Sequence, residues 1–113
     1  MNLNKKRFRT SENKSGLSSD ETTFQYFEKD SVISGRYHGG SIVEGTLLGK
    51  RVADDRIELL YQCLTDSGEL KAGQSTGALS INEDGLLEIR YDWQWLNGTR
   101  TGGKSVYIEI PER

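Results

Sequence analysis

The sequence contains few of the residues that disulfide bonding, metal binding and catalysis commonly use. It has one cysteine, Cys63, one histidine, His38, and one proline, Pro111, among 113 residues. A single cysteine excludes an internal disulfide framework and a cysteine-rich zinc site, and a single histidine leaves no histidine pair at metal-ligand spacing. Glycine-rich phosphate-binding and dinucleotide-binding motifs are also missing. We therefore expect no metal and no cofactor.

Long hydrophobic runs and an excess of positive charge are missing as well. No apolar run approaches the ~20 residues needed to cross a bilayer, and the first ten residues, MNLNKKRFRT, lack the apolar region of a signal peptide. The net charge of -2 is the reverse of the basic footprint of nucleic-acid-binding proteins. These features predict a cytoplasmic protein with no membrane or nucleic-acid partner.

Thirteen glycines are too many for a helical bundle, because each glycine inside a helix costs about 1 kcal/mol relative to alanine. From residue 21 onward, segments rich in β-branched and aromatic residues alternate with short clusters of Gly, Asn, Asp and Ser, which are typical of hairpin turns. We expect seven main strands and one weaker strand: Thr22–Glu28, Val32–His38, Ser41–Leu48, Arg56–Thr65, Glu69–Ser80, Leu86–Leu96, Lys104–Ile110 and, more weakly, Arg7–Ser11.

Strands that follow one another without helices between them pair antiparallel, so the sequence predicts an all-β antiparallel meander of about eight strands. Such a meander can close into a small up-and-down β-barrel without exposed edges, and an open curved sheet or a two-sheet sandwich are the alternatives. We expect one barrel domain over residues 21–113. Residues 1–20, which carry Lys5, Lys6, Arg7 and Arg9, are expected to form a polar N-terminal arm with a short first strand.

The alternation of side chains indicates which face of each strand is buried. From position 87 to 95 every odd residue is apolar or aromatic and every even residue is polar. We expect this face to share one core with two similar faces, Ile57, Leu59, Tyr61, Cys63 and Val106, Ile108, Ile110. Glycines inside strands mark bends, or places where a large side chain or a ligand comes close, and curvature is the favoured interpretation for Gly35, Gly45, Gly73 and Gly77.

No catalytic residue is predicted. His38 directly precedes Gly39-Gly40 at a predicted hairpin tip, where a solvated side chain is expected. Cys63 alternates with Leu59 and Tyr61 on an apolar face, so it is interpreted as a small buried hydrophobic residue. The many carboxylates fall mostly on the polar faces of strands, where they are expected to face solvent; inward-facing charges lining a polar cavity are the alternative.

The aromatic stripe Tyr91, Trp93 and Trp95 fits either a packed core or a ligand pocket or interface. The leading hypothesis is non-enzymatic binding of a small molecule at an open end of the barrel. A second hypothesis is homodimerisation or protein docking through the Trp93 and Trp95 face or an exposed sheet edge, and a third is an enzyme. The candidate ligand-binding residues are Arg36, Tyr37, Tyr61, Arg90, Trp93 and Trp95.

Three segments of the chain carry a family resemblance: ETTFQYF at 21–27, RYHGGSIVEGTLLG at 36–49, and YDWQWLNG followed by GGKS within 91–105. They resemble small single-domain bacterial proteins that are often named N-acetylglutamate synthase. The resemblance covers about residues 21 to 110 and implies a small β-rich fold similar to calycin or lipocalin barrels. The sequence lacks the Arg/Gln-x-x-Gly-x-Gly/Ala loop with which acetyltransferases bind acetyl-CoA, so no catalytic residue is carried over from them.

Overall fold

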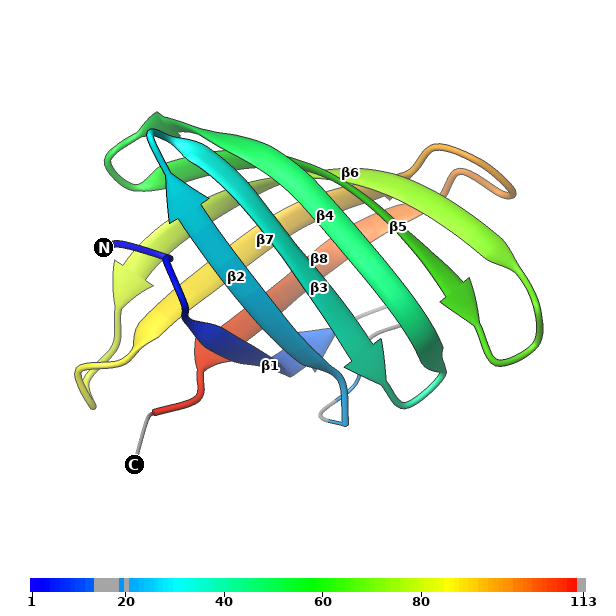
Figure 1. The fold of residues 1–113 in the computed structure, drawn as a ribbon, viewed down its shortest axis with the longest axis horizontal. Helices are drawn as coiled ribbons and strands as arrows, with labels where there is room; N and C mark the ends of the chain where they lie inside the picture. The colour runs from blue at the N-terminus through cyan, green and yellow to red at the C-terminus, as the bar shows by residue number, and fades with distance from the viewer. Residues whose placement is uncertain (14–18, 20, 112–113) are drawn as a thin grey trace.

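The chain folds into a closed β-barrel in which all eight strands follow chain order. The structure, a computed structural model, describes residues 1–13, 19 and 21–111. Each strand pairs antiparallel with its sequence neighbours, and the first pairs with the eighth, which closes the barrel (Figure 1). The predicted up-and-down barrel is thus confirmed. The strands are β1 (Arg7–Asn13), β2 (Thr23–Lys29), β3 (Val32–Gly39), β4 (Ile42–Ala53), β5 (Arg56–Thr65), β6 (Leu70–Ile81), β7 (Leu87–Trp95) and β8 (Gly102–Glu109).

Most turns lie where the sequence predicts them, but β4 is longer than expected. It continues to Ala53 instead of ending at Leu48. Its last residues pair with β5, Lys50 with Glu58 and Arg51 with Ile57. The connection to β5 is the short turn Asp54-Asp55. The predicted strand stopped before Gly49, because glycine weakens a strand; in the structure Gly49 lies inside β4, where a Cβ atom would clash with the backbone carbonyl of Glu58.

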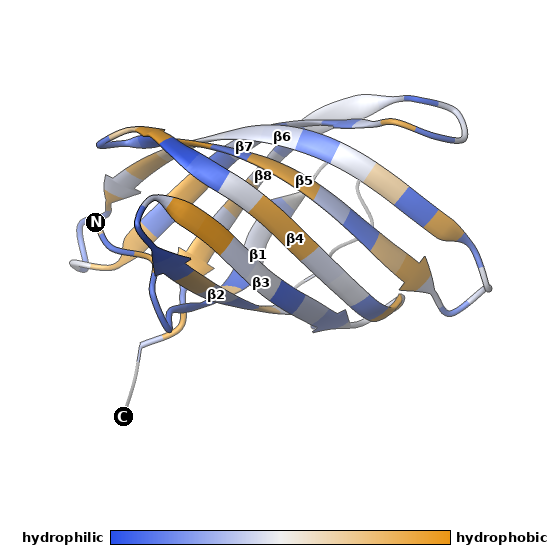
Figure 2. Cartoon of the chain, turned by 45° about the horizontal axis from the view of Figure 1, so that its top comes forward, coloured by the Kyte–Doolittle hydropathy of each residue, from blue (hydrophilic) through white to orange (hydrophobic). Residues whose placement is uncertain are grey.

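Buried and exposed residues alternate along the strands, and Figure 2 shows the matching bands of hydrophobic and hydrophilic residues. The odd residues of β7 are buried, as predicted. In β8 the predicted face is wrong: Ser105 and Tyr107 pair with the buried residues Tyr91 and Ile89, so they face inward. Cross-strand partners in a sheet share one face. Val106 pairs with Arg90 and Ile108 with Glu88, so these expected core residues lie on the outer face.

The N-terminal segment is part of the barrel. β1 closes the sheet between β2 and β8, with an irregular register between Thr10 and Glu12. Leu3 and Phe8 are both fully buried. The polar arm predicted for residues 1–20 is therefore built into the barrel over residues 1–13, while residues 14–18 and 20 lie outside the described residues. No helix in the described ranges is long and apolar enough to cross a membrane.

The two ends of the barrel have different contents. At the closed end, where Figure 1 shows the N-terminus and the end of β8 together, the buried side chains are mostly aliphatic. At the open end, beside the β5–β6 and β7–β8 connections, they are mostly aromatic. We define the closed end by Leu3, Phe8, Ile33, Ile57, Leu79 and Ile89, and the open end by Phe24, Tyr37, Tyr61, Trp93, Trp95 and Tyr107.

Candidate functional site

Three inward-facing tyrosines at and below the open end each lie across a glycine of the neighbouring strand. A Cβ atom at Gly45 would come within 2.3 Å of the Tyr37 ring, and one at Gly73 within 2.5 Å of the Tyr61 ring. The missing side chain therefore makes room for the ring to lie flat against the neighbouring strand. The pairs are Tyr37 with Gly45, Tyr61 with Gly73 and Tyr91 with Gly77.

The rings pack against one another around the interior of the open end. Phe24 stacks between Tyr37 and Tyr107, at centroid distances of 4.8 and 4.6 Å. On the other side, Trp95 meets Tyr61 edge-on at 5.8 Å and Trp93 at 5.5 Å. Such offset and edge-to-face pairs are the favoured geometries of aromatic rings, so the lining is well packed.

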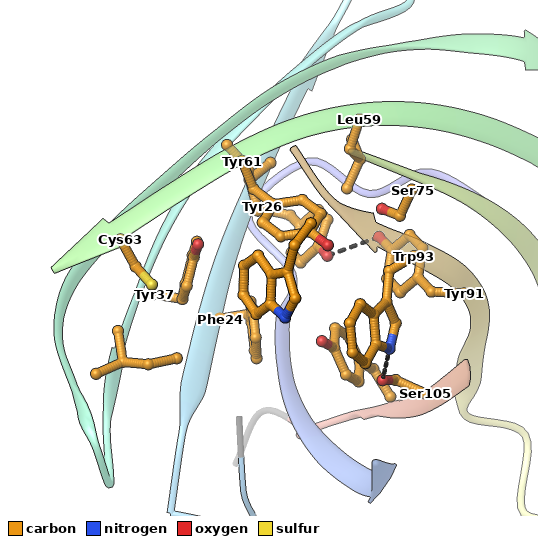
Figure 3. A pocket seen from close by; sticks show the side chains of 14 residues that line it. Phe24, Tyr26, Tyr37, Leu59, Tyr61, Cys63, Ser75, Tyr91, Trp93 and Ser105 are labelled. Carbon is orange, nitrogen blue, oxygen red and sulfur yellow. Dashed lines mark hydrogen bonds between the residues drawn. The ribbon is translucent and has the colours of Figure 1, made fainter. Parts of the chain in front are cut away.

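Several polar groups within this lining are satisfied internally. The Tyr26 and Tyr91 hydroxyls share a buried hydrogen bond of 2.7 Å, and the Trp93 indole Nε1–H donates to Ser105 Oγ at 2.8 Å (Figure 3). The Tyr37 hydroxyl donates to the backbone carbonyl of Gln62 at 3.0 Å. Burial raises the pKa of Tyr26 and of Tyr37 well above its ordinary value, so both hydroxyls stay protonated at neutral pH.

Three other polar groups of the lining have no hydrogen-bond partner among the described residues: the Ser75 hydroxyl, the Tyr61 hydroxyl and the Trp95 indole N–H. Ser75 and Trp95 are more than nine-tenths buried, with exposed fractions of 8% and 6%. Among the described residues, the one buried side-chain polar atom without a hydrogen-bond partner is Thr10 Oγ1. The polar atoms of Ser75, Tyr61 and Trp95 are therefore not sealed inside the protein. These three groups are therefore available to a bound molecule.

The space that these side chains leave is small. The cavity has a volume of about 50 Å³, whereas an ordinary ligand site has roughly 300–1,000 Å³. As it stands it has room for a few water molecules. The aromatic stripe thus fills most of the interior while also lining a cavity, so both interpretations of Trp93 and Trp95 hold in part.

Cys63 and Lys71 lie opposite each other at the mouth of this cavity. Cys63, near the end of β5, lines the cavity and pairs across strands with Lys71 at the start of β6. The Lys71 ammonium lies 4.6 Å from the centre of the Trp95 ring. Burial raises the pKa of the Cys63 thiol, so it is a weak nucleophile at neutral pH and behaves as the predicted buried residue.

Comparison with known proteins identifies the family. The model of the family described as "Avidin-like protein" matches residues 1–110. The chain belongs to the avidin-like family.

Solved structures agree with an avidin-like barrel. A structure described as apo shwanavidin is 15% identical, with a TM-score of 0.68 over 96% of this chain and 97% of that chain. An X-ray structure of a biotin binding protein from chicken is 12% identical, with a TM-score of 0.67 over 96% of each chain. At these identities the likeness shows the fold. No curated protein matches the sequence. Neither the family description nor the descriptions of these two structures mention N-acetylglutamate synthase.

The avidin-like barrel brings together four of the six candidate ligand-binding residues. Tyr37, Tyr61, Trp93 and Trp95 all line the cavity. Arg36 and Arg90 do not reach it. Arg36 neighbours Tyr37 in β3, and Arg90 neighbours Tyr91 in β7, so both side chains point to the outer surface. Arg90 lies there beside Glu88, with its Nη2 atom 3.7 Å from Glu88 Oε1.

Other lining residues were not predicted: Phe24, Tyr26, Ser75, Ser105 and Tyr107. For Tyr26 a signal was present, because an aromatic residue directly across a hairpin from a glycine points inward with it, as Tyr26 does across from Gly35. The serines carry no such signal. The alternative of inward charges lining a polar cavity is wrong for this cavity, since its described lining residues are all uncharged in their ordinary states. In the same described part of the chain, no three His, Cys, Asp or Glu side chains gather where they could hold a metal ion.

Proposed function

We propose that this avidin-like protein binds a small molecule in the aromatic open end of its barrel. The observation that carries the proposal is the set of unpaired polar groups, Ser75, Tyr61 and Trp95, inside a lining that is otherwise apolar. A few convergent polar groups in a concave aromatic site are typical of small-molecule binding. Biotin is the first candidate ligand, because a structurally similar chicken protein binds biotin.

A molecule of ordinary size needs more room than about 50 Å³. Tyr61 is the lining ring that can move at the least cost, because it is half-buried and its hydroxyl makes no hydrogen bond in the described structure. Tyr37, by contrast, is buried, stacked on Phe24 and bonded to Gln62. We therefore expect the ligand to bind as Tyr61 turns away from Gly73.

The proposal is tested by titrating the protein with biotin, then with a metabolite library, in calorimetry and thermal unfolding. A ligand at 100 times its Kd stabilises the folded state by about 2.7 kcal/mol. Ser75→Leu should fill the cavity and abolish the shift, whereas Thr76→Leu, at the neighbouring exposed position, should leave it unchanged. The absence of a shift with biotin would reject that ligand, and the absence of any shift with the library would reject small-molecule binding.

Binding of a second copy of the chain is a second candidate function, but not through the surfaces that the sequence pointed to. Trp93 and Trp95 are inside the barrel, and β1 and β8 pair, so neither strand is a free edge. An open groove on the outer face of β4–β8 fits better. It contains the exposed cross-strand neighbours Leu48 and Leu60.

Two ion pairs of opposite orientation flank these leucines. Lys50 in β4 lies 3.7 Å from Glu58 in β5, and Lys104 in β8 lies 3.7 Å from Asp92 in β7. Sedimentation should show a dimer that Leu60→Lys dissociates and that Leu70→Lys, at another exposed leucine, leaves intact. A monomer at all concentrations would reject this candidate.

A further inference from the structure

One side of the barrel carries positive charge that no carboxylate balances. The outward side chains of β1, β2 and β3 include four exposed cations, and none of the four forms an ion pair within the part of the chain that the structure describes. Among the described residues, the one outward carboxylate of these strands is Glu12, which follows the register irregularity of β1 and pairs with Val106 toward the open end. The four cations are Arg7, Arg9, Lys29 and Arg36.

Two exposed apolar side chains lie on the same face. Phe27 is 44% exposed and Val32 is 54% exposed. Phe27 pairs with Ser34, and Val32 lies two residues before Ser34 in β3, so Phe27 and Val32 are diagonal neighbours. Diagonal neighbours on one face lie about 7–8 Å apart, within reach of an aromatic ring. The two side chains therefore form one small apolar spot.

The strand register places the cations around this spot. Arg7 of β1 and Arg36 of β3 both pair with Gln25 of β2, so they lie in one row, two strand spacings or about 9.6 Å apart. Gln25 and Lys29 lie two residues before and two residues after Phe27, so this row and Lys29 border the apolar spot on opposite sides. We define the basic face by Arg7, Arg9, Phe27, Lys29, Val32 and Arg36.

This combination of side chains fits the surface of an anionic membrane. At such a surface, basic side chains bind the acidic headgroups while neighbouring aromatic and aliphatic side chains enter the lipid interface. A soluble polyanion would use the cations and leave Phe27 and Val32 in water. The basic face lies on the outside of a closed barrel, so it is convex and can rest on a flat surface but cannot enclose a small anion. Net charge and apolar runs, on which the expectation of no membrane partner rested, do not show which residues share a face.

We propose that the protein binds anionic phospholipid surfaces through the basic face. Phe27 and Val32 enter the lipid interface, and the surrounding cations bind the phosphate groups. Strands β1–β3 run between the two ends of the barrel, so the barrel lies on its side and both ends stay in water (Figure 1). No residue of the basic face lines the cavity, so the lipid contact is independent of the proposed function.

Flotation of the full chain with vesicles tests the role of charge. The protein should float with vesicles of phosphatidylcholine and phosphatidylglycerol but not with phosphatidylcholine alone, and salt should release it by screening the charges. Arg36→Gln should weaken binding about fivefold, the contribution of one basic residue near an anionic surface. Arg56→Gln removes the same charge from an exposed position of β5 and should bind as the unmodified protein does. No flotation with the anionic vesicles, or equal losses in the two variants, would overturn the proposal.

Fluorescence tests the apolar part of the contact. Phe27→Trp places a reporter in the basic face, and its emission should shift to the blue when the anionic vesicles are added. Trp93 and Trp95 are buried inside the barrel and should give a constant background. Leu70→Trp, at a more exposed position of β6, is the matched control and should show no shift. Unchanged emission in Phe27→Trp, or the same shift in both variants, would contradict entry of the basic face into lipid.

Competition separates the lipid surface from other sources of phosphate. A DNA duplex and inorganic phosphate are added to vesicle-bound protein, each at the phosphate concentration of the lipid and at constant ionic strength. The protein should stay on the vesicles in both cases, because neither competitor offers an interface for Phe27 and Val32. Release by the duplex would assign the basic face to a nucleic acid, and release by inorganic phosphate would assign it to a free anion; either result would reject the lipid surface.

Discussion

The closed end and the open end of the barrel bury different kinds of side chain. At the closed end, Leu3 covers a layer of aliphatic residues that includes Ile33, Ile57 and Ile89, all fully buried. At the open end, large rings lie on glycines and leave a cavity of about 50 Å³. Aliphatic side chains interlock without polar groups, whereas the rings bring hydroxyls and indole N–H groups into the interior.

The polar contacts follow the same division. At the closed end they hold the chain together from outside: Arg51 donates to both carboxylate oxygens of Glu28, at 2.7 and 2.8 Å, and to the carbonyl of Met1. At the open end, Ser75 and Tyr61 have no described partner. The difference fits the proposal that the open end binds a small molecule.

The largest expected effect tests the closed end. Ile89→Ala removes a fully buried side chain and should destabilise the fold by about 3 kcal/mol, because the cavity it leaves is only partly filled by its neighbours. Urea unfolding measures the loss. Ile81→Ala, at an exposed position, should change stability by less than about 0.5 kcal/mol. Equal losses in the two variants would contradict the assignment of the core to this end.

A smaller effect compares two glycines of the open end. Gly45→Ala forces a Cβ atom against Tyr37, which is buried and hydrogen-bonded, and should cost about 2 kcal/mol. Gly73→Ala meets the outer atoms of Tyr61, which can turn aside, so its cost should be about half as large. Urea unfolding of both variants gives the ratio. If Gly73→Ala is as costly as Gly45→Ala, Tyr61 is not the ring that moves.

The Tyr26–Tyr91 hydrogen bond lies between the two ends and gives a third, smaller effect. Tyr26→Phe leaves the buried Tyr91 hydroxyl without this partner and should cost about 1.5 kcal/mol. The double variant Tyr26→Phe/Tyr91→Phe should cost less than the sum of the single variants, because it removes both polar groups. A double-mutant cycle in urea measures this coupling. Strict additivity would show that the bond contributes nothing.

The sequence predicted the barrel well because hairpin turns and two-residue alternation are local signals. Residues 87–95 and the Gly39-Gly40 turn carried them clearly. The inward face of β8 was missed because Val106 and Ile108 are more apolar than Ser105 and Tyr107, and only pairing with β7 decides which pair faces inward. Arg36 and Arg90 were predicted in the site because a guanidinium suits a polar ligand. Their positions in β3 and β7 direct both side chains to the outer surface.

The smallest effect concerns the pH dependence of the closed end. Hydrogen bonds from Arg51 lower the pKa of Glu28 in the folded state, against the opposing effect of burial. A carboxyl group whose pKa is lower in the folded state than in the unfolded state stabilises the fold at pH values above its unfolded pKa. This stabilisation is lost as the pH falls through its folded pKa. Between pH 7 and pH 3, the free energy of unfolding measured in urea should fall less in Glu28→Gln than in the unmodified protein.

Glu109 provides the matched comparison for this prediction. Burial opposes ionisation there too, but the Leu87 backbone N–H and Lys6 lower its pKa, so Glu109→Gln should also reduce the acid loss. The Tyr37 and Tyr61 hydroxyls at the open end have raised pKa values because they are buried, and they do not titrate in this range. Acid should therefore weaken the closed end and leave the protonation of these hydroxyls unchanged. If the free energy of unfolding falls between pH 7 and pH 3 by as much in both glutamine variants as in the unmodified protein, other groups cause the acid sensitivity.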